Sequence, residues 1–140
     1  MIYQATKAIS DAFKDAGLKC SVQEVDSLSF VETGFTAENC TFKLFFISTD
    51  DDNDVKAVTE DFAKYPESKL QSGYKMMNEL SQTYKYFKFT IDDKGAVRAR
   101  FDFPVSLSTE AVGKVAVEIA LRCMSIVDDA YPKIMKSIWQ

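Results

Sequence analysis

Histidine is missing from all 140 residues of this chain. Its absence excludes the Ser–His and Cys–His pairs of nucleophilic catalysis, and it excludes zinc sites with histidine ligands. The sequence also has no Cys-x-x-Cys pair, no Walker-type phosphate loop and no dinucleotide-binding glycine motif. We therefore expect a protein that is not an enzyme, with no catalytic residues, no metal site and no cofactor. A small enzyme that uses a single carboxylate or lysine is the alternative.

Long apolar runs are absent too, since no stretch approaches the ~20 apolar residues of a membrane-spanning helix. The N-terminal residues, Met1–Lys7, enter a helical pattern without the apolar region of a secretion signal. A net charge of −4 and a pI of about 4.9 argue against a nucleic acid or an anionic membrane as the partner. Cys20, Cys40 and Cys123 are odd in number and widely spaced, which favours reduced thiols. We expect a cytoplasmic protein.

Apolar and aromatic residues, in contrast, are plentiful, at 46% and 13%. At this length a single domain, residues 1–140, can bury a real core. Helical spacing of apolar residues predicts a first helix over about Tyr3–Ala16, ended by Gly17. The apolar stripe of this helix consists largely of small alanine side chains, so we expect the helix to cover the edge or one end of a sheet and not to form the core. Leu18–Val25 and Leu28–Phe35 have the pattern of short strands.

The clearest local signal is a hairpin within Lys85–Val105. Two alternating runs flank Asp93-Lys94-Gly95, a loop in which Gly95 can take the left-handed conformation that side chains resist. This loop pairs Ile91 with Val97, Phe89 with Ala99 and Phe87 with Phe101. Loop chemistry and apolar alternation thus select the same register.

Cys40–Ser48 is predicted to be a strand that is apolar on both faces, because Phe45 and Ile47 face away from the side that bears Phe42, Leu44 and Phe46. Such a strand is either covered twice or exposes a patch for a partner. Val55–Tyr65 fits both a helix and a strand, and we favour a strand that closes a three-stranded meander. After Pro66, a stripe at Leu70, Tyr74, Met77, Leu80 and Tyr84 predicts a second helix.

A long third helix is predicted to begin near Ser108 or Thr109, either of which could cap it. Its main apolar stripe is widened by Val117, Leu121 and Met124 beyond the usual ~100°. A helix this apolar is expected to be buried on more than one side. Pro132 should kink it or begin a separate last segment that ends near Ile138-Trp139.

The predicted order is helix, three strands, helix, two strands, helix (α-β-β-β-α-β-β-α), an α+β domain of two layers with an antiparallel sheet. Several segments resemble the YbjN family: Pro66-Glu67-Ser68-Lys69, Asn78-Glu79-Leu80, Tyr84, Phe87-Lys88-Phe89, the turn Asp92–Gly95, and Val97-Arg98-Ala99-Arg100 followed by an apolar helix. The resemblance covers Val55 to the C-terminus well, and the earlier residues only by element order. It implies a fold like that of type III secretion chaperones and a protein described as a sensory-transduction regulator. It further implies dimers that bind other proteins without catalysis.

Two groups of charged residues suggest alternative functions. Lys88, Arg98 and Arg100 share the outer face of the hairpin, and they define an alternative function as a small enzyme or an anion- or nucleic-acid-binding protein. Pairing with Glu60, Asp61 or Asp102 is the more ordinary role for them.

The spacing of calcium-loop ligands occurs at Asp50, Asp52, Asp54 and Asp61, but Val55 stands where that loop needs glycine. We interpret that segment as a solvated turn.

We therefore expect a non-catalytic protein-binding module, chaperone-like or regulatory. One two-layer domain cannot easily cover both sets of extra apolar residues, Phe45 and Ile47 on the strand and Val117, Leu121 and Met124 on the last helix. These five residues are the candidate partner-binding residues, and they predict a homodimer that binds a further protein. No membrane partner is expected, and nucleic acid is the weaker alternative.

Overall fold

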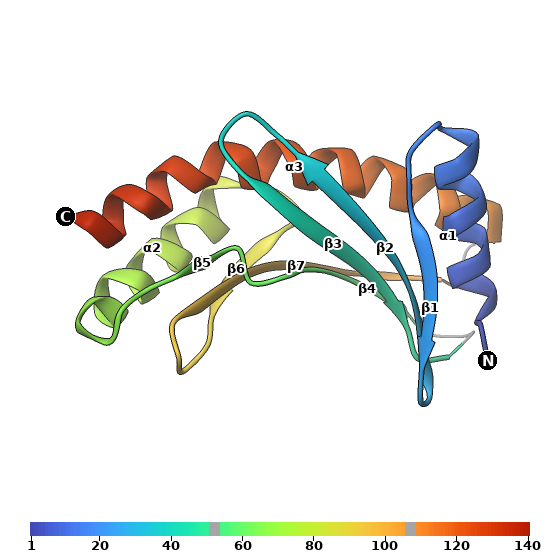
Figure 1. The fold of residues 1–140 in the computed structure, drawn as a ribbon, viewed down its shortest axis with the longest axis horizontal. Coiled ribbons are helices and arrows are strands. Elements are labelled where there is room, and N and C mark those ends of the chain that lie inside the picture. The colour runs from blue at the N-terminus through green and yellow to red at the C-terminus, as the bar shows by residue number, and fades with distance from the viewer. Residues whose placement is uncertain (51–53, 106–108) are drawn as a thin grey trace.

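The computed structural model describes residues 1–50, 54–105 and 109–140. Within them the chain forms three α-helices, one short 3-10 helix and a seven-stranded antiparallel sheet (Figure 1), which confirms the predicted α+β fold. The elements in chain order are α1 (Gln4–Asp15), β1 (Ser21–Val25), β2 (Leu28–Thr36), β3 (Thr41–Ser48), β4 (Asp54–Thr59), β5 (Ala63–Lys64), η1 (Glu67–Lys69), α2 (Leu70–Thr83), β6 (Lys88–Ile91), β7 (Ala96–Pro104) and α3 (Thr109–Trp139).

The strand order is β1-β2-β3-β4-β7-β5, with β6 on the other edge of β7. The predicted strand Val55–Tyr65 is in fact two strands, β4 and β5. The predicted strand Leu18–Val25 is present as β1, and the sheet has seven strands where the predicted element order counted five. The break comes after Thr59. Here the Thr59 hydroxyl, and not a backbone carbonyl, accepts the hydrogen bond from the backbone N–H of Ala99 at 3.0 Å. Glu60 then pairs with β3, because its carboxylate accepts the backbone N–H of Lys43 at 2.8 Å. A bulge at this point therefore joins β4 to β5 along β7.

The predicted hairpin register is confirmed, since Phe89 lies opposite Ala99 and Ile91 opposite Val97. Gly95 has a φ of +89°, in the left-handed region. Its carbonyl accepts the backbone N–H of Tyr65 at 2.8 Å, and a Cβ at this position would lie 2.1 Å from the carbonyl oxygen of Tyr65. Glycine is required here both by the turn and by the close approach of the next chain segment.

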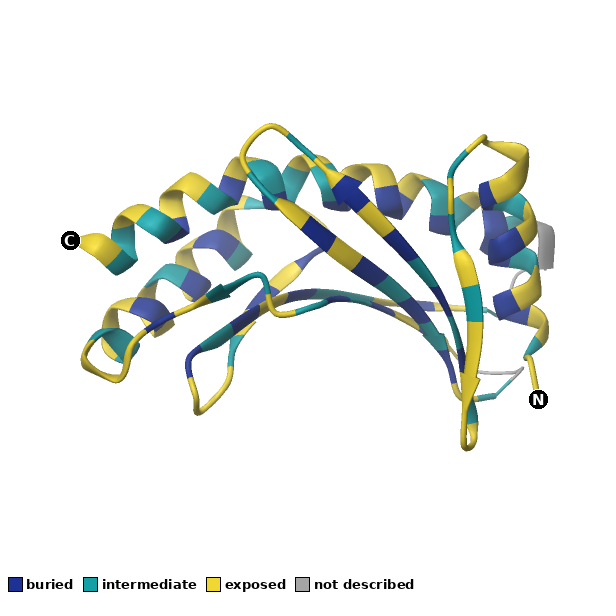
Figure 2. Cartoon of the chain, in the orientation of Figure 1, coloured by how far each residue is buried: buried dark blue, intermediate teal, exposed yellow. Residues whose placement is uncertain are grey.

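The core lies between one face of the sheet and the three helices. Along β2 and β3, buried residues alternate with half-buried or exposed ones (Figure 2), as expected for a sheet that helices cover on one side only. At the β1–β3 end of the sheet α1 covers this face, and the rings of Phe13 and Phe46 lie 5.6 Å apart between centroids. At the other end α2 packs on β6, where Met77 and Leu80 are buried; Tyr74, predicted on the same stripe, is exposed.

Pro132 lies inside α3, which continues to Trp139 as one helix. The predicted alternative of a separate last segment after Pro132 is therefore wrong. The turns after the proline are held by tertiary contacts. Ile134 is fully buried, and the hydroxyls of Tyr65 and Ser137 are hydrogen-bonded. The residues proposed to cap the start of α3, Ser108 and the Thr109 side chain, lie outside the described part of the chain.

Candidate protein-interaction surfaces

The face of the sheet that points away from the helices carries an apolar cluster, formed by Phe30, Phe45, Ile47 and Val58 and called here the sheet patch. Phe30 pairs with Ile47 across β2 and β3, and Phe45 pairs with Val58 across β3 and β4. The rings of Phe30 and Phe45 meet edge to face at 5.8 Å between centroids. All four side chains are half-buried by neighbouring side chains. Within the described residues no helix lies over them.

The predicted orientation of Phe45 and Ile47 is thus confirmed. Phe30 and Val58 were not predicted, although Phe30 alternates with the inward-facing Val31 inside a recognised strand. The outward direction of Val58 could not be predicted, because its segment fits both a helix and a strand. Only the pairing of β3 between β2 and β4 makes these four residues neighbours.

Charged side chains of both signs surround the sheet patch. Along one cross-strand row, Glu32 and Arg100 flank the pair Phe45 and Val58. Along the next row, Lys56 lies between Ile47 and Asp102. The patch is therefore an apolar centre with a mixed charged rim, which is the composition of many transient protein interfaces.

The basic residues of the β6–β7 hairpin are close to acceptors within the chain. Arg100 contacts the Asp102 carboxylate at 3.0 Å, Arg98 is paired with Asp61, and Lys88 donates to the Ser81 carbonyl at 2.9 Å. The hydrogen bond and charge of Asp61 raise the pKa of Arg98. Arg98 and Arg100 are thus paired with carboxylates and Lys88 donates to a backbone carbonyl, so the geometry gives the anion-binding alternative no specific support.

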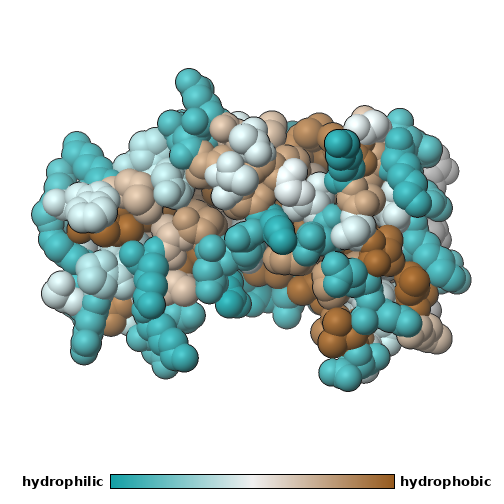
Figure 3. Space-filling model, viewed as in Figure 1, coloured by the Kyte–Doolittle hydropathy of each residue, from teal (hydrophilic) through white to brown (hydrophobic). Residues whose placement is uncertain are grey.

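Val117, Leu121 and Met124 lie on α3, on the opposite side of the sheet from the sheet patch. Leu121 is 45% exposed, whereas Val117 and Met124 are half-buried and pack against the core. The five predicted partner-binding residues therefore form two surfaces, which the structure does not bring together. Figure 3 shows hydrophobic atoms at the surface along the middle of the molecule and at the end that carries the N-terminus.

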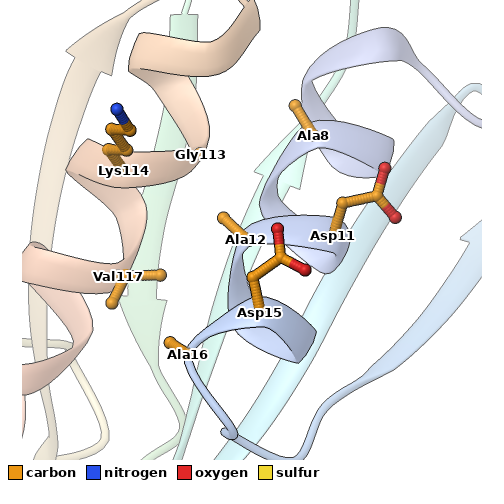
Figure 4. A pocket seen from close by; sticks show the side chains of 8 residues that line it. All are labelled: Ala8, Asp11, Ala12, Asp15, Ala16, Gly113, Lys114 and Val117. Carbon is orange, nitrogen blue, oxygen red and sulfur yellow. The ribbon is translucent and has the colours of Figure 1, made fainter.

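A groove of about 570 Å³ runs between α1 and α3, and Val117 is part of it. Its lining residues are Ala8, Asp11, Ala12, Asp15, Ala16, Gly113, Lys114 and Val117 (Figure 4). We call it the α1–α3 groove.

Small residues bring the two helices together along the floor of this groove. A Cβ at Gly113 would lie 2.8 Å from the carbonyl oxygen of Ala8 and 2.9 Å from the Cβ of Ala12. In Figure 4 the Val117 side chain points toward α1, while Asp15 and Lys114 extend from opposite sides. The alanines of α1 at four-residue spacing could have indicated such a groove, but nothing local identifies α3 as their partner.

Reactive thiols and metal ligands are not features of these surfaces. Cys123 is fully buried, and burial raises the pKa of its thiol, as it does for the half-buried Cys40. Among the described residues no group of three or more Cys, Asp or Glu side chains could hold a metal ion. Asp52, one of the four aspartates with calcium-loop spacing, lies outside the described residues. No helix in the described segments has the length and apolarity to cross a membrane.

The fold and these surfaces define an α+β protein in which the helices cover one sheet face, while the other face bears an apolar patch that no described helix covers. Comparisons with family models, with curated proteins and with solved structures found no match for the chain.

Proposed function

We propose that this protein is a non-catalytic protein-binding module, chaperone-like or regulatory, which acts as a homodimer in the cytoplasm. The observation that carries the proposal is the sheet patch, four adjacent apolar side chains on a sheet face that no described helix covers. A sheet face turned to water usually carries polar residues, so a contiguous apolar cluster there marks an interaction site. The sequence resemblance to the YbjN family supports the same proposal, because it implies dimers that bind other proteins.

The partner segment that fits the sheet patch best is an amphipathic helix. Both edges of β3 and of β4 are already hydrogen-bonded within the sheet, so an added strand would find no free backbone groups there. A partner must therefore contact side chains and satisfy its own backbone, as a helix does. Its apolar stripe would cover Phe45 and Ile47, and its charged flanks would meet Glu32, Lys56 and Arg100.

Capture of a partner from the source cell tests this proposal. The tagged parent protein is compared with Phe45→Thr and Ile47→Thr, which remove apolar surface but keep a residue that favours strands. Tyr74→Glu serves as the control, because Tyr74 lies on α2 and is 43% exposed. We expect a defined polypeptide that binds the parent and the control and is lost from both threonine variants.

Circular dichroism and thermal melting must show that both threonine variants remain folded. Binding that survives the loss of Phe45 and Ile47 would contradict the proposed site. Turnover of a small molecule by the purified parent would contradict the non-catalytic function.

A further inference from the structure

We infer that the α1–α3 groove is the dimer interface, and that the α3 helix of a second copy of this chain lies in it. This inference rests on the proposed homodimer and assigns a surface to it. The sheet patch, on the other side of the sheet, then remains open for the partner protein.

Shape complementarity is the first argument. Along α1 the groove offers only alanine side chains, Ala8, Ala12 and Ala16, between its charged positions, and it can therefore accept a larger side chain. On α3, one turn after Val117, stands Leu121, which at 45% exposed is the most exposed leucine or isoleucine on that helix. A two-fold interface must carry both halves of each contact on the same surface. This surface carries a recess of small residues and, beside it, an apolar side chain able to fill one.

Charge complementarity is the second argument, and it selects which helix enters the groove. Asp11 and Asp15 form an acidic side on α1, whereas Lys114 lies on α3. If α1 of the second copy entered the groove, its two aspartates would meet those of the first copy. If α3 enters instead, its Lys114 meets the acidic side, and unlike charges face each other at both ends of the two-fold interface.

The spacing on α3 agrees with this arrangement. Lys114 and Leu121 are two turns apart on nearly the same side of the helix, about 10 Å along its axis. Side chains on a helix lean toward its N-terminus, so Leu121 covers the turn that precedes it. With Lys114 of the second copy beside Asp11 and Asp15, its Leu121 lies about two turns farther along the groove, past the acidic side of α1. The nearby Glu118 and Arg122 are paired with each other at 2.8 Å within one chain.

The test is the dimer dissociation constant of the full chain, measured by sedimentation equilibrium. We expect Leu121→Glu to be monomeric with an unchanged circular dichroism spectrum, and Leu121→Ala to dimerise at least about tenfold more weakly. Tyr74→Glu, an exposed aromatic on another helix, should dimerise as the parent does. A Leu121→Ala protein that is folded and dimerises with the parent's affinity would overturn the inference.

Charge reversal gives an independent measurement. Lys114→Glu should weaken the dimer, as should Asp11→Lys combined with Asp15→Lys, and the triple variant should recover most of the parent's affinity. Each weakening should diminish at high salt, which screens exposed charges. Failure of the triple variant to recover affinity would contradict the proposed pairing of α3 with α1.

The outcomes separate this inference from the proposed function. If Phe45→Thr abolishes the dimer while Leu121→Glu does not, the protein is a dimer through the sheet patch and the inference fails alone. If the parent is a monomer at high concentration, the homodimer of the proposed function fails together with the inference. Leu121→Glu should still capture the partner polypeptide, because the sheet patch is untouched.

Discussion

The side-chain amide of Asn39 donates to the carbonyl oxygen of Asp128 at 3.2 Å, four residues before Pro132 in α3. Proline has no N–H, so this carbonyl lacks the helical donor that position 132 would normally supply. The backbone N–H of Asn39 also donates to the Asp128 carboxylate, at 2.6 Å. The connection between β2 and β3 therefore satisfies the group that the proline leaves unpaired, and α3 can pass through Pro132.

We expect Asn39→Ala to lower the free energy of unfolding by about 1 kcal/mol, the usual net contribution of one hydrogen bond. In a Pro132→Ala background the cost should be smaller, because the new N–H at position 132 can donate to the Asp128 carbonyl. Urea unfolding of the four proteins in this double-mutant cycle measures the difference. Asn78→Ala, at an exposed position on α2, is the control. Equal costs in both backgrounds would show that Asn39 does not compensate for the proline.

Two glycines with positive φ allow the hairpin contact to be tested separately from backbone strain. Gly17 has a φ of +75° and open space around it, whereas a Cβ at Gly95 would meet the carbonyl oxygen of Tyr65. Gly17→Ala should cost about 1–2 kcal/mol from the left-handed conformation alone. Gly95→Ala should cost at least ~1 kcal/mol more, because the Tyr65 to Gly95 hydrogen bond must also shift. Equal losses in denaturant unfolding would mean that Tyr65 does not constrain the loop.

Asp92 should make the hairpin sensitive to acid. Its carboxylate accepts the backbone N–H groups of Ala96 and Lys94, both at 2.9 Å, and these bonds, that of Ala96 first, hold the pKa of Asp92 below its ordinary value of 3.8. A carboxyl group with a lowered folded-state pKa stabilises the protein above its unfolded pKa, and this contribution is lost as pH falls through the folded value. The parent should therefore melt above Asp92→Asn at neutral pH, and the difference should shrink below pH 3.8.

Melting curves across this pH range check the prediction for Asp92. Asp93→Asn removes the same charge from the same loop without touching the two bonds, so its melting temperature should lie closer to the parent's. A difference between the parent and Asp92→Asn that persists unchanged in acid would show that the hydrogen bonds do not depend on the charge.

Calcium should leave the melting temperature unchanged. Asp61, the last aspartate of the calcium-loop spacing, is paired with Arg98 on the outer face of the sheet. A calcium ion at 100 times its dissociation constant would add about 2.7 kcal/mol to the free energy of unfolding. Differential scanning calorimetry with millimolar calcium, against a sample treated with chelator, distinguishes the cases. A clear rise in melting temperature would show that the aspartates between Asp50 and Asp61 bind the ion.

Most elements could be predicted from the sequence because their signals are local. The β6–β7 hairpin is the clearest case, since Gly95 and the alternation around it specify the same register without reference to any distant residue. The outward direction of Phe45 and Ile47 also follows from the two-residue period of a strand. The sequence therefore predicts two of the four residues of the sheet patch, Phe45 and Ile47. It does not predict their neighbours Phe30 and Val58, which come from other strands.

The tertiary structure decided what depends on contacts between distant residues. The break between β4 and β5 depends on the Thr59 hydroxyl reaching Ala99, and the continuity of α3 depends on Asn39 reaching Asp128. The sheet patch exists because β3 pairs with both β2 and β4, and the α1–α3 groove exists because Gly113 packs on Ala8. Backbone periodicity is a property of neighbouring residues and can be read from the chain. Hydrogen bonds and packing across the fold join residues that no local pattern connects, so only the folded chain reveals them.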